Sequence, residues 1–194
     1  MKQHSIDARS ELLKIAKNLQ HLDLDEHWDL VADCAQWHDL GKAHPQFQTA
    51  IANRTDVWAK SPSMSHYQRR GFRHELASAI GALIQGKSFL FAYIVAAHHG
   101  KVRVQLDNFY WLKDEKGLRG SISGDKIQAC SLGNDAAGEE VRIDEFSINL
   151  PDSGEWKILV EKEIENLGVF KLSYLETLVR IADRRASALR KVDM

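Results

Sequence analysis

The sequence is poor in cysteine and proline. Its 194 residues include two cysteines and three prolines, and Cys34 and Cys130 lie far apart without forming a CxxC pair. This argues against a disulfide framework and against a thiolate zinc site. We therefore expect a soluble globular protein in a reducing cytoplasm.

Long apolar runs and a strong net charge are also missing. The longest apolar run, Phe89 to Ala97, is too short to span a bilayer. The stretch from Met1 to Asn18 lacks the continuous apolar core of a signal peptide. We therefore expect neither export nor membrane insertion. The formal net charge is -1, so a polyanion would have to be held by a local basic patch or by bound cations.

Helical periodicity is the main pattern that the sequence contains. Apolar residues recur at three- and four-residue steps over most of the chain, which predicts an all-α fold. The expected helices span residues 5–19, with Ser5 as the N-cap, and residues 28–40, 45–53, 74–85, 88–98, 155–167 and 169–189. A chain of this length is expected to form a single domain over residues 1–194.

Two segments interrupt this pattern. Residues 54–73 contain Pro62, Gly71, several serines and more basic than acidic residues, which predicts a loop with local positive charge. Residues 101–153 are rich in glycine, aspartate and asparagine, and the alternation within residues 140–150 is only partly strand-like. We expect this second segment to be a flexible insertion, either a small hairpin or a flap.

Several polar side chains lie on helix faces that should point into the core. His38 and Asp39 continue the apolar stripe of the second helix, and Asp183 continues that of the last. His98 and His99 follow an apolar helix. Further histidines are His74, at the start of a helix, and His4, just before the first one. A buried carboxylate or imidazole needs a compensating partner.

Each of these residues alone has an ordinary explanation. A histidine on an apolar face is often a hydrogen-bonded core residue, Asp183 can pair with Arg180 or Arg184, and His4 can be an exposed terminal residue. Together, however, imidazoles and carboxylates form the mixed nitrogen and oxygen set that suits transition metals. We therefore predict that His4, His38, Asp39, His74, His98, His99 and Asp183 bind divalent metal ions, with Mn, Ni, Co, Fe, Mg and Zn as candidates.

The order of these residues resembles that of the HD-superfamily phosphohydrolases, and within them that of the HD nuclease domain of the nuclease-helicase recruited by type I CRISPR effector complexes. The likeness lies in the stretch from Trp37 to Lys42 with the following Pro45 to Gln48, in His74-Glu75, in the stretch from His98 to Gly100, and in that from Ala182 to Ser187. It implies an HD-domain helical bundle with a long irregular insertion between the His-His and final Asp motifs.

The resemblance also implies roles for residues. One metal would be held by His4, His38, Asp39 and Asp183, and a second by Asp39, His74, His98 and His99, so that Asp39 joins the two. Lys42 would face the scissile phosphate and Ser187 would hydrogen-bond it. The alternatives are a solvated helix-end cation for Lys42 and an ordinary packing residue for Ser187.

The family pattern predicts a two-metal mechanism. Two cations about 3.5 to 4 Å apart would polarise a phosphodiester, and a bridging hydroxide would attack it in line. The expected substrate is single-stranded DNA, or RNA, in type I CRISPR interference, and the expected partners are a CRISPR effector complex and a helicase. Because only three residues precede His4 and the chain carries no helicase motif, we expect a domain excised from, or following, a helicase.

The loop of residues 54–73 is a candidate nucleic-acid surface. It places Arg69, Arg70 and Arg73 among aromatic residues such as Trp58 and Tyr67, a combination that suits single strands. The alternative is a solvated loop whose aromatic side chains fold back onto the core.

Three rival interpretations deserve a test. Residues 81–88 match the phosphate-loop pattern of nucleoside triphosphatases, but they continue a helix that Gly86 should end. A second rival is an HD phosphohydrolase that acts on nucleotides or cyclic nucleotides and encloses its substrate. The third is a degenerate, non-catalytic HD scaffold.

Overall fold

The computed structural model describes residues 1–19, 21, 27–51, 64–100, 104, 106, 117–133, 136–150 and 153–192. The chain is mostly helical, which confirms the predicted all-α class. Its helices are α1 (Lys2–Asn18), α2 (Trp28–Trp37), α3 (Pro45–Ala50), α4 (His74–Ile84), α5 (Phe89–Ala97), α6 (Glu145–Asn149) and α7 (Glu155–Val192), with a 3-10 turn η2 (Leu40–Ala43).

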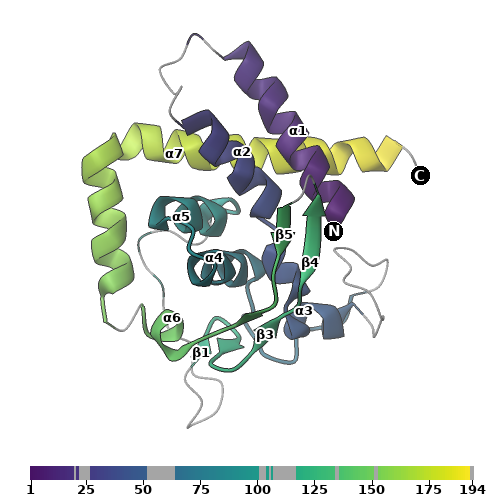
Figure 1. Ribbon diagram of the computed structural model, residues 1–194, viewed down its shortest axis with the longest axis vertical. Coiled ribbons are helices and arrows are strands. Elements are labelled where there is room, and N and C mark those ends of the chain that lie inside the picture. Colours follow the sequence, from purple (N-terminus) through teal and green to yellow (C-terminus); the bar gives the residue numbers. More distant parts are fainter. Residues whose placement is uncertain are drawn as a thin grey trace.

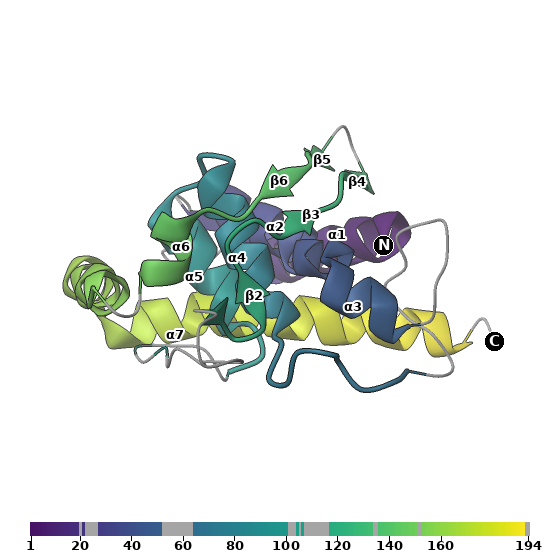
Figure 2. The ribbon, with the colours of Figure 1, turned by 90° about the horizontal axis from the view of Figure 1, so that it is seen from below.

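The helices form layers around a core made of α2, α4 and α5. Helix α7 bends at Gly168, where φ is 76°, and its second half runs along one side of the molecule beneath these helices (Figures 1 and 2). Helix α1 packs against both α7 and α2. The backbone at Gly168 is non-helical, so α7 consists of two helical segments that meet at the residue where the prediction separated 155–167 from 169–189.

Helices α4 and α5 form a tight hairpin at the centre. Both helices are apolar on nearly all faces, and neighbouring elements cover them. In α5, every residue from Phe91 to Ala97 is buried. Gly86, with φ of 78°, follows the end of α4, and the Ser88 hydroxyl caps α5 by accepting a hydrogen bond from Phe91 N at 3.2 Å. The segment that resembles a phosphate loop is thus a helix end, as predicted.

Several helix boundaries differ from the prediction. Helix α1 begins at Lys2, with Met1 as N-cap, because Ser5 N already donates to Met1 O at 3.2 Å, so Ser5 lies inside the helix. Helix α2 ends at Trp37 instead of Leu40. The chain turns at His38 and Asp39 and tightens into η2, which brings the two predicted ligands to a helix end. Helix α3 ends at Ala50, and the last expected residues of this helix lie outside the described ranges.

Described parts of the insertion at 101–153 form small antiparallel hairpins, as predicted. Strand β1 (Gly117–Leu118) pairs with β2 (Ser121–Ile122). Strand β3 (Lys126–Ile127) pairs with β6 (Val141–Arg142). Between these two strands in the sequence, β4 (Cys130–Gly133) pairs with β5 (Ala136–Gly138). The partly strand-like stretch at 140–150 gives the short β6 and then α6, whose N-cap Asp144 accepts from Ser147 N at 2.7 Å.

This strand region covers the helical core on the side opposite α7 (Figure 2). Strand β4 lies against α1. The buried amide of Gln36 in α2 donates to Leu132 O at 3.1 Å and to Gly133 O at 2.8 Å. The described hairpins are therefore anchored to the bundle by specific hydrogen bonds. Among the described helices, none combines the length and the apolar character needed to cross a membrane.

Candidate metal centre

The seven residues predicted as metal ligands lie together, although they come from five separate segments. His4 belongs to α1, His38 and Asp39 to the turn after α2, His74 to the start of α4, His98 and His99 to the end of α5, and Asp183 to α7. Close contacts between side-chain nitrogen and oxygen atoms connect six of them into two groups, and His98 joins through its ring contacts.

The first group surrounds two carboxylates. His4 Nε2 lies 3.0 Å from Asp183 Oδ1 and 3.5 Å from Asp39 Oδ2. His38 Nε2 lies 3.4 Å from each of the same two oxygens. Two imidazole nitrogens thus converge with two carboxylate oxygens. His4, His38 and Asp39 form a group that could hold one cation, and Asp183 Oδ1 borders this group.

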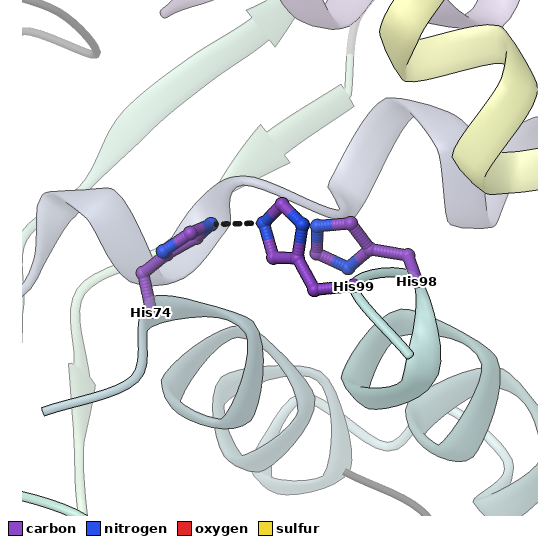
Figure 3. A group of neighbouring side chains, drawn as sticks. All are labelled: His74, His98 and His99. Atoms are coloured by element: carbon purple, nitrogen blue, oxygen red, sulfur yellow. Dashed lines mark hydrogen bonds between the residues drawn. The ribbon is translucent and has the colours of Figure 1, made fainter. Parts of the chain in front are cut away.

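The second group consists of three histidines. The ligand nitrogens of His74, His98 and His99 all lie within 4.8 Å of one another. Figure 3 shows His98 and His99 side by side at the end of α5, with His74 reaching toward them from the start of α4. His74 Nε2 and His99 Nε2 are 3.2 Å apart. A set of three imidazoles is a second place that could hold a cation.

His38 and His98 are oriented in the same way. Each is 1% exposed, and each Nδ1 faces the carbonyl oxygen of the residue three positions earlier, at 2.7 Å for Ala35 and 2.5 Å for Val95. A carbonyl only accepts, so Nδ1 carries a proton, and Nε2 is the ring nitrogen that faces the site and can bind a cation. Neither buried Nε2 has a hydrogen-bond partner. A buried ring nitrogen without a hydrogen-bond partner is costly unless a cation binds it, and this ring arrangement is one that metal-binding histidines use.

Asp39 lies between the two groups. Its Oδ2 faces His4 and His38, while its Oδ1 lies 3.3 Å from His74 Nε2. The side chain is 3% exposed. Burial alone would raise the pKa of this carboxyl, but the positive charges of His38 and Lys42 outweigh burial and hold the pKa well below its usual range. Asp39 is therefore ionised, with one oxygen available to each group.

Electrostatic coupling is strong throughout the site. Burial opposes protonation of His38, yet Asp39 and Asp183 outweigh it and raise the pKa of His38 to about 10. Burial and the neighbouring histidines hold the pKa of His98 well below its usual range. The pKa of Asp183 lies below its usual range, because the close contacts with His38 and His4 lower it more than burial raises it. In the absence of a cation, the proton on His38 supplies the positive charge that these carboxylates require.

Ser78 and Gly41 fix the distance between the two groups. Ser78 Oγ is fully buried, accepts from Gly41 N at 2.7 Å, and lies 2.8 Å from His38 O and 2.9 Å from His74 O. A β-carbon on Gly41 would lie 2.0 Å from His74 O, so only glycine allows this approach. The sequence pattern gives no sign of this hydrogen-bonded link, because Gly41 and Ser78 are 37 residues apart in the chain.

The two further residues with predicted catalytic roles border the first group. Lys42 Nζ lies 2.6 Å from Asp39 Oδ2 and 5.8 Å from the centre of the Phe47 ring. Ser187 Oγ lies 3.5 Å from Asp183 Oδ1, one helical turn away. Both residues therefore border the first donor group, and their contact with a phosphate stays a prediction.

The three arginines predicted to bind nucleic acid have different surroundings. Arg69 pairs with Asp125 and donates to Gly120 O at 3.2 Å, while Arg73 Nη1 lies 3.0 Å from Glu75 Oε1. These two guanidinium groups thus tie the loop to its neighbours. Arg70 is exposed and lines a cavity of about 590 Å³ together with Tyr67. Trp58, also part of that prediction, lies outside the described residues.

The carboxylate of Asp125 binds Arg69 and two further groups. Its Oδ2 also accepts from Ile122 N at 2.8 Å and lies 3.1 Å from Nε2 of the fully buried His44. Burial opposes ionisation, but hydrogen bonds from His44 and Arg69 outweigh it and lower the pKa of Asp125 to about 2. This cluster stabilises the contact between the 64–73 loop, η2 and the strand region.

One known protein family matches the part of the chain that contains most of the candidate metal ligands. A family model described as Cas3, HD domain matches residues 2–150, which include six of the seven predicted ligands and end before Asp183. This confirms the predicted resemblance to HD nuclease domains of CRISPR nuclease-helicases. No curated protein and no solved structure matches the chain significantly.

Proposed function

The chain belongs to the family of Cas3 HD domains, and we propose that it is a metal-dependent nuclease that hydrolyses phosphodiester bonds in single-stranded DNA during type I CRISPR interference. It would bind two divalent metal ions and act in the cytoplasm with a helicase, in the same or another chain, and with a CRISPR effector complex. The residues 1–194 would form one nuclease domain.

The position of Asp39 supports this function more than any other observation. One carboxylate whose two oxygens face separate donor groups is the arrangement that a two-metal site requires. We assign His4, His38 and Asp183 to one ion and His74, His98 and His99 to the other. Asp39 would join both.

The composition of the donor set bears on the metal. Five imidazoles and two carboxylates favour Mn, Fe, Co, Ni or Zn. Mg prefers oxygen ligands and retains several waters, so a site with this many nitrogens is a poor match for it. Among the candidates, we expect Mn, Co or Ni to support the highest activity.

Bound cations would polarise the phosphodiester and supply an ionised water at neutral pH. The residues of the chain would contribute in distinct ways. The buried side chains of His38 and Asp39 hold donors in a fixed geometry away from bulk water. Lys42 would place a positive charge next to the phosphate, and Ser187 would donate a hydrogen bond to it.

The exposure of the second group favours a strand over a small nucleotide. His99 is exposed, and the His74 side chain is 15% exposed, so the site is open on this side. An enzyme that acts on a free nucleotide usually encloses its substrate. A polymer must instead pass across its site.

A combined metal and cleavage assay tests the proposal. Purified protein is analysed for metal content and then assayed with labelled single-stranded DNA, single-stranded RNA and a panel of nucleotides across divalent cations. We expect Mn-, Co- or Ni-dependent cleavage of single-stranded DNA. The Asp39→Ala variant should lose both metal and cleavage, whereas Asp29→Ala, an exposed acidic position in α2, should retain both.

Two outcomes would overturn this function. Hydrolysis of nucleotides without strand cleavage would identify a nucleotide phosphohydrolase. Metal binding without any hydrolysis would identify a scaffold. Substantial cleavage by Asp39→Ala in the presence of Mn would reject the two-metal arrangement.

A further inference from the structure

Helix α7 carries two exposed arginines on the flank that borders Asp183. Arg180 lies three residues before Asp183, and Arg184 directly follows it. At about 100° per residue, Arg180, Arg184 and Ser187 all fall on the same side of Asp183, within roughly a quarter to a third of the helix circumference. The buried face of α7, which includes Val179 and Ala182, lies on the other side.

Arg180 reaches from α7 to the turn that carries the second donor group. A β-carbon placed on Gly100 would lie 3.5 Å from Arg180 Nη1. Gly100 directly follows His99 and has a φ of 71°, a conformation that other residues rarely adopt. The guanidinium group of Arg180 therefore lies over a bare backbone turn next to the candidate metal centre.

The charges of these two arginines are not balanced by the described part of the chain. Neither forms an ion pair with a residue that the structure describes, whereas the neighbouring Arg185 Nε lies 2.9 Å from Glu11 Oε2. Asp183 is held by His4 and His38, so it does not pair with Arg180 or Arg184. Two guanidinium groups beside a phosphodiester site can each bind a phosphate with paired hydrogen bonds.

The alternative basic surface is weaker. In the loop of residues 64–73, Arg69 and Arg73 are engaged by Asp125 and Glu75. The α7 flank also presents Thr177 and Ser173 further along the helix and no aromatic side chain among these positions. Such a surface contacts the strand backbone without reading bases, which suits a nuclease that degrades any sequence.

We propose that Arg180 and Arg184 bind successive backbone phosphates of a single strand where it leaves the metal centre along α7. This inference rests on the proposed function. The two positions are separated by one helical turn, about 6 Å along the axis, and both side chains are long enough to adjust to neighbouring phosphates. Binding should therefore be electrostatic and independent of sequence.

The salt dependence of binding tests this inference. The full chain and the double variant Arg180→Ala/Arg184→Ala are titrated against fluorescently labelled oligo-dT in chelator, so that no cleavage occurs. The double variant should bind about tenfold more weakly at low salt. Its slope of log affinity against log salt should be smaller by about 1.4, the value for two lost contacts with a single strand.

Three controls complete the design. Arg142→Ala removes an exposed arginine from β6, on the side of the molecule opposite α7 (Figure 2), and should leave affinity and slope unchanged. The variant Arg180→Lys/Arg184→Lys keeps both charges and should keep the salt slope. Metal content measured on each variant should equal that of the unmodified chain, which shows that the site itself is intact.

The outcomes separate this inference from the proposed function. If Arg180→Ala/Arg184→Ala binds with the same affinity and salt slope as the unmodified chain, and the unmodified chain cleaves DNA, the proposed phosphate contacts along α7 are wrong. The proposed nuclease function would then still stand. A loss of the same size in Arg142→Ala would also overturn it, because it would indicate a general charge effect. If the unmodified chain neither binds nor cleaves a single strand in any metal, the proposed function itself fails.

Discussion

Asp39 Oδ1 lies 3.3 Å from His74 Nε2, and this contact joins the end of α2 to the start of α4. It depends on the close approach of two backbone segments at Gly41. The carboxylate can face both donor groups because the chain leaves the α-helix at His38 and Asp39 and tightens into η2.

Removing one ligand from each group should remove different ions. His4→Ala should lower the metal content from about two ions per chain to about one, because the histidine group is left intact. His99→Ala should cause the same loss at the other site. The measurement is elemental analysis after equilibration with Mn, and His66→Ala, at an exposed histidine outside the site, is the control. Loss of both ions in either single variant would contradict independent groups.

Replacing Ser78 should disturb the spacing between the groups. Ser78→Ala leaves Gly41 N without its acceptor, which should lower the free energy of unfolding by about 1 to 3 kcal/mol. In Mn-loaded protein the spin coupling between the two ions, read by electron paramagnetic resonance, should change. Ser131→Ala, at an exposed position in β4, should alter neither quantity. An unchanged spectrum for Ser78→Ala would show that Ser78 stabilises the fold without positioning the groups.

The metal-free protein should lose stability as the pH rises. The pKa of His38 is raised from 6.5 to about 10, so its stabilising charge is fully present below pH 6.5 and disappears between about 6.5 and 10. Metal affinity should rise over the same range, because a cation replaces that proton. Melting temperatures in chelator and with Mn, measured from pH 6 to 10, test both trends. A constant melting temperature of the metal-free protein over this range would argue against a charged His38.

Asp125 should matter for stability. Asp125→Asn should lower the free energy of unfolding by about 1 to 3 kcal/mol, because hydrogen bonds from His44 and Arg69 lose their charged acceptor. The lowered pKa, about 2, means that this contribution is present above pH 4 and lost as the pH falls toward 2. Chemical denaturation at several acidic pH values should therefore show the variant and the unmodified chain converging. Asp33→Asn, at a half-exposed side chain, should change stability by less than about 0.5 kcal/mol.

Most helices and the set of candidate metal ligands could be predicted from local sequence patterns. Residues such as His38 and Asp183 were recognisable because they continue apolar stripes, a signal that needs only the helical period. The end of α2 was not predictable in this way, because the period continues to Leu40 and a tertiary contact at Gly41 overrides it. The start of α1 at Lys2 could not be predicted either, because the N-cap residue Met1 has no side chain that caps the helix.

Contacts with partners that lie far away in the chain could not be predicted from the sequence. The pairing of Arg69 with Asp125, which is 56 residues away in the chain, could not be predicted from the sequence. Ser78 had no special signal, since its three hydrogen-bonding neighbours come together only through the packing of η2 on α4. The periodicity placed Arg180 and Arg184 near Asp183, but only the fold indicates that they do not pair with it.

His4 and Asp183, which meet at 3.0 Å, are 179 residues apart in the chain. A contact this remote forms late, because closing so long a loop costs entropy that other contacts must first offset. During synthesis on the ribosome, the first donor group is therefore incomplete until the second half of α7 has emerged and packed against α1. A nascent or truncated chain that lacks this part of α7 would carry the histidine group beside a first group without Asp183, so both donor groups are complete only after α7 has folded.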